Sequence, residues 1–225
     1  MKIKLIATIF ILFPAFIFGY PKNYPKKEKI TEKLYEMMES FHRLLTENNI
    51  PYFIIHGTLL GAVRDKELIP WDDDIDLGIL EKDIEKFNLL EDKFKDQGFE
   101  FYRCTDKVCN KAGLCLFYKI CPKDGQEFNG PWYKKYPWID VMTFVIKDNK
   151  VSHHPSGPFS VWKHAYFDKE ELFPLKNYSL GKLQVLGPNI PKPFLSRFYP
   201  NWQTTYVFWA HRKALAHGFQ EFLSR

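Results

Sequence analysis

The stretch IPWDDDIDLGI, residues 69–79, places four aspartates directly before an apolar run. Like charges at adjacent positions repel one another, so the arrangement costs stability unless a cation or a cationic partner compensates it. A solvated acidic loop is the ordinary interpretation of a charge run. Over residues 74–79, however, apolar residues alternate with Asp74 and Asp76. Alternate side chains share one face of a β-strand, so this pattern predicts a strand with both aspartates on one face.

The composition is that of an ordinary globular protein. The chain has 225 residues, of which 45% are hydrophobic and 26% charged, which is enough for one domain with a sizeable core. The formal net charge is +5, and the basic residues are interspersed with acidic ones. Because no long basic run is present, we expect no nucleic-acid partner.

The N-terminus has the layout of a secretory signal peptide. Lys2 and Lys4 precede a short apolar stretch that ends at Gly19, and its length falls below the roughly 20 residues that a membrane span needs. We predict a signal peptide over 1–19, a linker over 20–28 and a domain over 29–225. The chain is then expected in the secretory pathway (the endoplasmic reticulum or Golgi lumen) or outside the cell. The alternative is a single-pass anchor, and membrane contact is expected only if the segment stays uncleaved.

Two further features are typical of that route. Asn177-Tyr178-Ser179 is an acceptor sequence for N-glycosylation. The chain also has four clustered cysteines: Cys104, Cys109, Cys115 and Cys121. In an oxidising compartment they predict two disulfides with three connectivities left open. A zinc site with four thiolates is the alternative, although no pair has the two-residue spacing of a zinc knuckle.

Periodicity along the chain predicts alternating helices and strands. Helices are expected over 29–48, 59–65 and 83–97, and strands over 52–56, 74–79, 99–103, 114–120 and 139–146. Thr58 is the expected N-cap of the second helix. Such alternation is typical of an α/β-type (α+β) fold, here a single domain with a mixed β-sheet flanked by helices.

The aspartates predict a divalent metal site. Two carboxylates at positions i and i+2 of one strand face converge on one cation, and oxygen ligands suit Mg²⁺ or Mn²⁺. Asp140, between Ile139 and Val141, is the candidate third carboxylate, because a charge is costly in an apolar strand without a function. An EF-hand is excluded, since Leu77 occupies the position that requires glycine.

The turn before the acidic stretch predicts a phosphate site. Gly57 and Thr58 lie between a strand and a short helix, where backbone amides bind anions and glycine allows close approach. Arg64 is expected to hold a diphosphate through two parallel hydrogen bonds. The pair His153-His154 is interpreted as polar loop residues, because adjacent imidazoles in a strand point to opposite faces.

The stretch GTLLGAVRDKELIPWDDDIDLGI, residues 57–79, closely resembles the signature of the LicD family. This family includes bacterial phosphocholine transferases and human fukutin and fukutin-related protein. Weaker similarity follows at PWIDVM, residues 137–142, and at PKPFLSRFYPNW, residues 191–202. The resemblance spans roughly residues 30–205, and its first motif is the specific one.

The resemblance implies a nucleotidyltransferase-like fold and the transfer of a phosphorylated alcohol from a CDP-linked donor to a glycan. It makes Asp74 and Asp76 metal ligands, and Asp140 either a third ligand or the base for the acceptor hydroxyl. Gly57 and Thr58 match the family's phosphate-binding turn, and Arg64 its following arginine. Asp72 and Asp73 also match, with a role in ordering the loop or in binding a second cation.

The leading functional hypothesis is therefore a Mg²⁺- or Mn²⁺-dependent phosphotransferase. Its partners would be a nucleotide-diphospho-alcohol donor and a glycan or glycoprotein acceptor. The transferred group (phosphocholine, ribitol phosphate or a similar one) stays open. The alternative is a catalytically inactive, secreted protein of the same fold that binds glycans or nucleotides.

Overall fold

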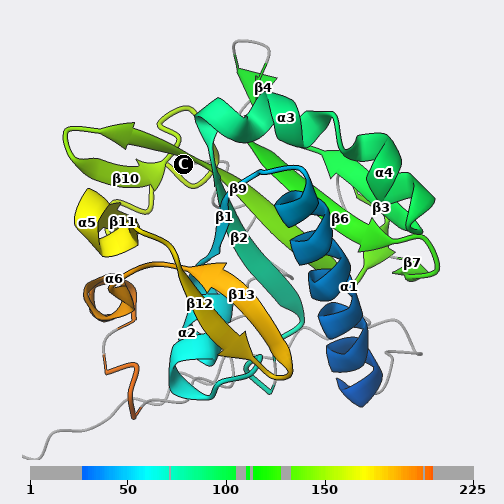
Figure 1. Ribbon diagram of the computed structural model, residues 1–225, viewed down its shortest axis with the longest axis horizontal. Coiled ribbons are helices and arrows are strands. Elements are labelled where there is room, and N and C mark those ends of the chain that lie inside the picture. Colours follow the sequence, from blue (N-terminus) through cyan, green and yellow to red (C-terminus); the bar gives the residue numbers. More distant parts are fainter. Residues whose placement is uncertain are drawn as a thin grey trace, which may run out of the picture. The chain divides into compact units, whose positions relative to one another are not determined.

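The computed structural model describes residues 27–70, 72–104, 110–111, 114–127, 133–199 and 201–204. All of these belong to one compact unit, Lys26–Phe208, which has the predicted α/β architecture with a mixed sheet flanked by helices (Figure 1). The predicted signal peptide lies outside the described residues. Among the helices that are described, none is both long and apolar enough to cross a bilayer.

A seven-stranded sheet forms the centre of the unit. Its strands run in the order β1-β2-β9-β10-β11, while β6 also pairs with β9 and β3 pairs with β6. The strands are β1 (Tyr52–Ile54), β2 (Asp74–Leu80), β3 (Phe99–Arg103), β6 (Phe117–Pro122), β9 (Trp138–Lys147), β10 (Lys150–His153) and β11 (Tyr166–Asp168). β2 and β9 are parallel, and the other neighbouring strands of this sheet are antiparallel.

Smaller elements complete the unit. Three two-stranded sheets are formed by β4 (Asn110–Lys111) with β5 (Leu114–Cys115), β7 (Gln126–Glu127) with β8 (Lys135–Tyr136), and β12 (Lys176–Leu180) with β13 (Leu183–Gly187). The described helices are α1 (Lys27–Glu47), α2 (His56–Arg64), the 3₁₀ helix η1 (Glu81–Asp83), α3 (Ile84–Asn88), α4 (Glu91–Asp96), α5 (Lys169–Leu172) and α6 (Pro191–Phe198).

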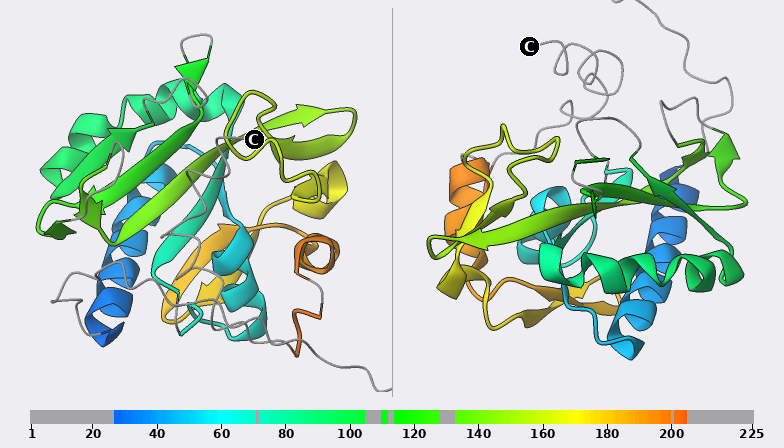
Figure 2. Two further views of the ribbon diagram at one scale, coloured as in Figure 1. Left: turned by 180° about the vertical axis from the view of Figure 1, so that it is seen from behind. Right: turned by 90° about the horizontal axis from the view of Figure 1, so that it is seen from above.

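Part of the hydrophobic core lies between the sheet and the helices on one of its faces. α1, α3 and α4 lie on the same face (Figure 1), and the opposite face of the sheet is seen from behind in Figure 2. Phe41, Phe87 and Phe94 from these three helices pack their rings together. Every residue of β2 is buried, so the aspartates of this strand are held in the interior of the fold.

Several predicted boundaries differ from the structure. The predicted helix over 83–97 is broken into η1, α3 and α4, because a tight turn at Leu90 (Leu90 N–H to Phe87 O, 3.0 Å) keeps Leu90 and Phe94 in the core. The predicted strand over 114–120 divides at Leu116, since β5 pairs with β4 while β6 pairs with β3 and β9.

Candidate metal centre

The parallel pairing of β2 with β9 brings together the three aspartates predicted as metal ligands. In the register of these strands Asp76 is the Cα partner of Asp140, and Asp74 lies two residues before Asp76. Each of the three offers one carboxylate oxygen, and these oxygens lie within 4.8 Å of one another. All three residues are buried. Two strands that are distant in the sequence therefore form one oxygen-rich cluster.

The cluster concentrates negative charge in the interior. Burial raises the pKa of Asp76 well above its ordinary value, and the carboxylates of Asp74, Asp140 and Asp72 raise it further. The pKa of Asp72 is also raised well above the ordinary value, first by burial and then by Asp74 and Asp73. Asp72, Asp73 and Asp74 form a second group of carboxylate oxygens within 4.8 Å of one another.

The residues present fit a divalent cation. Oδ1 of Asp72 and Oδ1 of Asp74 are buried and have no hydrogen-bond partner among the described residues. A buried carboxylate oxygen without a partner is costly. Mg²⁺ and Mn²⁺ prefer carboxylate oxygens, so a bound cation would both satisfy these oxygens and offset the repulsion between the aspartates.

The start of α2 is fastened to β2 at the aspartate cluster. The backbone N–H of Gly57 donates to Oδ2 of Asp76 at 3.2 Å, and the N–H of Asp76 donates to Oγ1 of Thr58 at 2.8 Å. The N–H of Ile55 donates to the carbonyl oxygen of Asp76 at 3.1 Å. The positive end of the α2 dipole thus faces a carboxylate of the cluster, which helps to hold negative charge there.

This arrangement corrects the predicted role of Thr58. α2 begins at His56, its N-cap residue is Ile55, and no side chain caps it. The Thr58 hydroxyl accepts a hydrogen bond from the backbone of β2 instead, so the prediction of Thr58 as N-cap is wrong.

Gly57 occupies a position where a side chain would not fit. A Cβ atom there would lie 2.6 Å from Oδ2 of Asp72, which is closer than a van der Waals contact allows.

Arg64 lies in the last turn of α2, and its guanidinium forms an ion pair with the next residue, Asp65. Its Nε atom donates to Oδ1 of Asp65 at 2.9 Å and its Nη2 atom to Oδ2 at 2.7 Å. The Arg64 side chain is 7% exposed, so the guanidinium is held as a two-pronged donor close to the protein interior. Its predicted contact with a diphosphate stays a prediction.

Three residues near the cluster were missed by the sequence analysis. Lys119 in β6 forms a buried ion pair with Asp140, and the Tyr136 hydroxyl donates to Oδ2 of Asp73 at 3.2 Å. The pKa of Tyr199 is raised well above its ordinary value by burial and then by the carboxylates of the cluster. Lys119 carried a usable signal, because a lone charge in the apolar strand FYKICP is the same kind of anomaly as Asp140.

The cysteines differ from the prediction of two disulfides. Cys115 and Cys121 are buried free thiols, whereas Cys104 is disulfide-bonded. Cys109 lies outside the described residues. Both free thiols belong to strands that continue into the core, and burial raises the pKa of Cys121 to about 12. Within the described part of the chain, the groups of side chains that could hold a metal contain aspartates and no cysteine.

The two adjacent histidines have different environments. His153 is the last residue of β10, and it is buried with its Nε2 atom 3.2 Å from Nε2 of His56. The interpretation of His153 as a loop residue is therefore wrong. His154 follows the strand, and its Nε2 atom lies 3.2 Å from Oε1 of Glu81.

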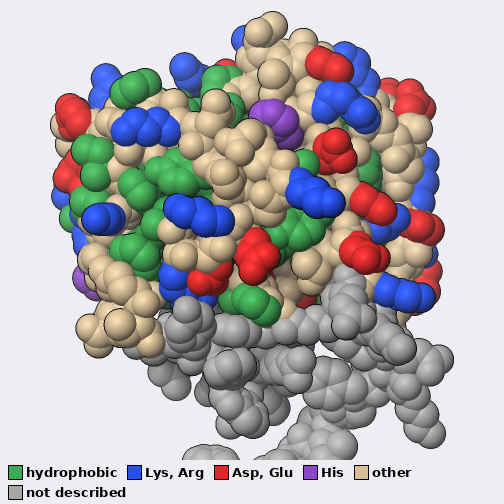
Figure 3. Space-filling model, turned by 60° about the horizontal axis from the view of Figure 1, so that its bottom comes forward, with side chains coloured by type: hydrophobic (Ala, Val, Ile, Leu, Met, Phe, Trp, Pro, Cys, Tyr) green, Lys and Arg blue, Asp and Glu red, His purple; other side chains and the backbone are tan. Residues whose placement is uncertain are grey.

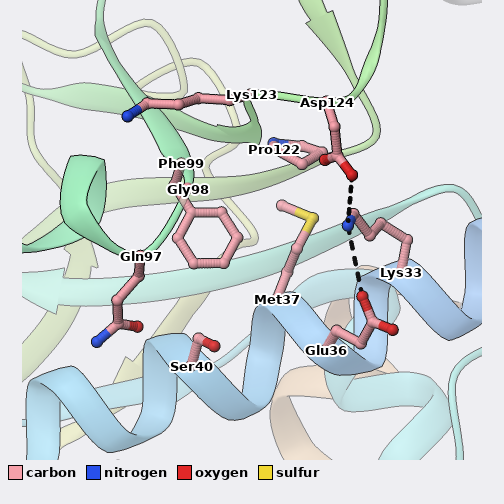
Figure 4. Close-up of a pocket in the computed structure, with 10 residues that line it drawn as sticks. All are labelled: Lys33, Glu36, Met37, Ser40, Gln97, Gly98, Phe99, Pro122, Lys123 and Asp124. Carbon is pink, nitrogen blue, oxygen red and sulfur yellow. Dashed lines mark hydrogen bonds and ion pairs between the residues drawn. The ribbon is translucent and has the colours of Figure 1, made fainter.

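A hollow of about 340 Å³ lies away from the aspartates (Figure 4). Met37 and Phe99 point into it, and Lys33 on its rim contacts Glu36 and Asp124. Its lining contains none of the cluster residues, so it is not part of the candidate metal centre. On the face drawn in Figure 3, basic and acidic side chains are interspersed, with hydrophobic ones between them.

The mixed sheet brings three buried carboxylates together beside the start of α2, an arrangement that could hold a metal ion. Residues 49–190 match the family model described as "LicD/FKTN/FKRP, nucleotidyltransferase domain". The chain therefore belongs to the LicD family, as its signature over residues 57–79 predicted.

Relatives in three organisms illustrate the range of the similarity. The chain is 34% identical to the protein RP689 of Rickettsia prowazekii over 85% of its own length and 67% of the relative's. It is 29% identical to mouse "Ribitol 5-phosphate transferase FKRP" over 68% of its length and 28% of the relative's. It is 41% identical to "Lipopolysaccharide cholinephosphotransferase LicD" of Haemophilus influenzae over 23% of its length and 19% of the relative's. The chain thus spans two thirds or less of these relatives.

Proposed function

We propose that this chain is a Mg²⁺- or Mn²⁺-dependent phosphotransferase. It moves a phosphorylated alcohol from a CDP-linked donor to a hydroxyl group of a glycan. The observation that carries the proposal is the convergence of Asp74, Asp76 and Asp140 at the start of α2, where the buried Oδ1 of Asp74 has no hydrogen-bond partner among the described residues. A purely structural domain has no need of such a costly cluster.

Each part of the centre has a distinct task in this proposal. Asp74, Asp76 and Asp140 would hold the cation, which supplies electrostatic stabilisation of the charge on the phosphate oxygens. The hydrogen bonds of Gly57 and Thr58 to Asp76 fix the position of one ligand. Because Gly57 has no side chain, the carboxylate of Asp72 can lie close to the backbone at this point.

Arg64 is the proposed donor-binding residue. Its guanidinium already presents two N–H groups in parallel to the carboxylate of Asp65. A diphosphate offers the same pairing geometry as a carboxylate. We therefore assign Arg64 to the donor's phosphates, with Asp65 as the residue that holds the guanidinium before the donor arrives.

The transfer itself is a direct displacement. The acceptor hydroxyl oxygen forms a bond to the phosphorus that carries the alcohol, and the bond from that phosphorus to the bridging oxygen breaks. CMP leaves with the electron pair of the broken bond, and the hydroxyl proton passes to a base or to water. Such a transfer depends mainly on positioning and on electrostatic stabilisation, which are the properties that the buried cluster provides.

The comparisons support the class of reaction. The names of two relatives describe transfer of ribitol 5-phosphate and of cholinephosphate, both of which are phosphorylated alcohols. The proposed location in the secretory pathway, or outside the cell, is supported by the sequence of residues 1–19.

The test is release of CMP from a panel of CDP-linked alcohols. Purified protein is incubated with CDP-ribitol, CDP-glycerol or CDP-choline, with Mn²⁺ or with a chelator, and with or without glycan acceptors. We expect CMP release from one donor of the panel that requires the metal and rises with an acceptor. Asp76→Asn should remove this activity.

Asp92→Asn is the matched control, because Asp92 has a side chain that is 94% exposed and lies outside both carboxylate groups. It should keep the full rate. CMP release that is equal in the chelator, or equal in the Asp76→Asn variant, would contradict the proposal. Metal-dependent binding of a donor without any release of CMP would favour an inactive, nucleotide-binding protein instead.

A further inference from the structure

A row of charged residues crosses three neighbouring strands at the metal centre. Lys119 of β6 is the Cα partner of Asp140 in β9, and Asp140 is in turn the Cα partner of Asp76 in β2. The Lys119 ammonium reaches along this row, and its Nζ atom lies 2.5 Å from Oδ1 of Asp140. A fixed positive charge therefore contacts one of the three proposed metal ligands.

The surroundings of the Lys119 ammonium are dry and aromatic. The side chains of Lys119 and Asp140 are 7% and 10% exposed. Nζ lies 4.0 Å from the centroid of the Trp138 ring and 4.8 Å from that of Tyr133. Aromatic faces attract a cation, and together with the carboxylate they replace the water that a surface lysine would keep. Lys119 is thus held as a buried charge.

The charges of the three proposed ligands, counted without the neighbouring Asp72 and Asp73, balance those of a divalent cation when Lys119 is included. Three ionised carboxylates carry three negative charges, of which Lys119 offsets one and a divalent cation the other two. Without Lys119 the same ligands would hold the cation in an excess of negative charge. That excess would strengthen the attraction of the cation to the protein and would reduce the positive charge that is left for a bound diphosphate.

We infer that Lys119 is a positioning residue that fixes Asp140 and sets the charge of the metal centre. It weakens the hold of the aspartates on the cation, so that the cation attracts the donor's phosphates more strongly. This inference rests on the proposed function, because it assigns Lys119 a role in binding the metal and the donor together.

The test replaces Lys119 by a side chain of similar length without charge. Mn²⁺ binding to Lys119→Met is measured by calorimetry in the absence of nucleotide. We expect a dissociation constant at least tenfold lower than that of the wild type. In the CMP-release assay we expect the same variant to show a donor KM at least tenfold higher. Lys119→Arg keeps the positive charge. Its dissociation constant for Mn²⁺ and its donor KM should therefore stay closer to the wild-type values than those of Lys119→Met.

Lys123→Met is the matched control, because Lys123 follows the end of β6 and is exposed. It should leave both quantities unchanged. If Lys119→Met does not fold without metal, Lys119→Gln is measured in the same way. The rise of melting temperature on addition of Mn²⁺ gives a second readout, and it should be larger in the uncharged variant than in the wild type.

Mn²⁺ binding that is unchanged or weaker in the uncharged variant overturns the inference, since Lys119 would then not oppose the cation. This outcome can be told apart from failure of the proposed function. Wild-type protein that binds Mn²⁺ but releases no CMP from any donor would contradict the phosphotransferase proposal. The comparison of Mn²⁺ affinities would still decide the role of Lys119 in the centre.

Discussion

The imidazole rings of His56 and His153 lie nearly parallel, with 9° between their planes and 3.2 Å between their Nε2 atoms. A hydrogen bond between two Nε2 atoms requires one ring to donate and the other to accept, so two imidazolium ions cannot form it. Aromatic rings surround the pair: Phe144, Phe159, Trp162, Phe194 and Phe198. The start of α2, which contacts Asp76, is thereby linked to the end of β10.

The first prediction concerns acid stability. Burial, and then the neighbouring His56, lower the pKa of His153 well below its ordinary value. Below about pH 6.5 the His153 imidazole binds a proton in the unfolded chain but does not yet do so in the folded protein. The contribution of His153 to the free energy of unfolding is therefore complete above about pH 6.5. It is lost as the pH falls toward the pKa that His153 has in the folded state. The loss reaches up to about 1.4 kcal/mol per pH unit.

Urea denaturation between pH 8 and pH 5 measures this effect in the wild type and in His153→Phe. The phenylalanine ring suits the aromatic surroundings and does not titrate. The free energy of unfolding should fall less steeply with acid in the variant than in the wild type. Parallel curves for the two proteins would show that His153 does not contribute to the loss.

The second prediction concerns the cost of the aspartates without metal. Asp76→Asn should weaken Mn²⁺ binding at least tenfold, because a charged ligand is lost. The melting temperature of the metal-free protein should stay the same or rise. The amide oxygen still accepts the N–H of Gly57, while the neutral amide replaces a group whose charged form is disfavoured by burial and by neighbouring carboxylates. A marked drop in the metal-free melting temperature would mean that the Asp76 carboxylate stabilises the fold.

The third prediction concerns protons released by the metal. Since the pKa values of Asp72 and Asp76 are raised well above the ordinary value, the metal-free centre retains protons that a cation must displace. Mn²⁺ affinity should fall as the pH is lowered, by about tenfold per pH unit for each proton displaced. Calorimetry in two buffers with different heats of ionisation measures the number released, and equal binding heats in both buffers would contradict the prediction.

The fourth prediction concerns the space at Gly57. In Gly57→Ala the new methyl carbon would lie 2.6 Å from Oδ2 of Asp72 and 3.6 Å from Oδ2 of Asp76. The carboxylates must shift, so Mn²⁺ affinity should fall at least tenfold. Gly98→Ala is the control: Gly98 has φ +84° and no atom within 4 Å of an added Cβ. That control should lose about 1 kcal/mol of stability and keep its Mn²⁺ affinity. Equal Mn²⁺ affinities in the two variants would show that Gly57 does not contribute to the metal centre.

The sequence predicted the parts of this fold that depend on local patterns. The alternation around Asp74 and Asp76 predicted β2 and the shared face of the two aspartates. The apolar stripe over 29–48 predicted α1, which begins two residues earlier than expected. The strand over 99–103 matches β3. Each of these patterns reflects burial on one face of a regular element, which short segments record directly.

The missing parts depend on partners that are distant in the chain. Nothing near Lys119 in the sequence indicates that it contacts Asp140 on the neighbouring strand β9. His153 resembled a loop residue because the ring that it contacts, His56, comes much earlier in the chain. The two-disulfide prediction followed from the expected compartment, and it was wrong because Cys115 and Cys121 lie in strands that pack into the core.

The parallel pairing of β2 with β9 also has a consequence for how the protein folds. All the elements from η1 to β8 lie between these strands in the chain, so their association is a long-range event of the kind that slows folding. The three carboxylates meet only after that pairing has formed. A cation that binds them recognises the folded state alone and stabilises it by mass action. Addition of Mn²⁺ should therefore lower the rate of unfolding. The rate of folding, which depends on the pairing of β2 with β9, should stay unchanged.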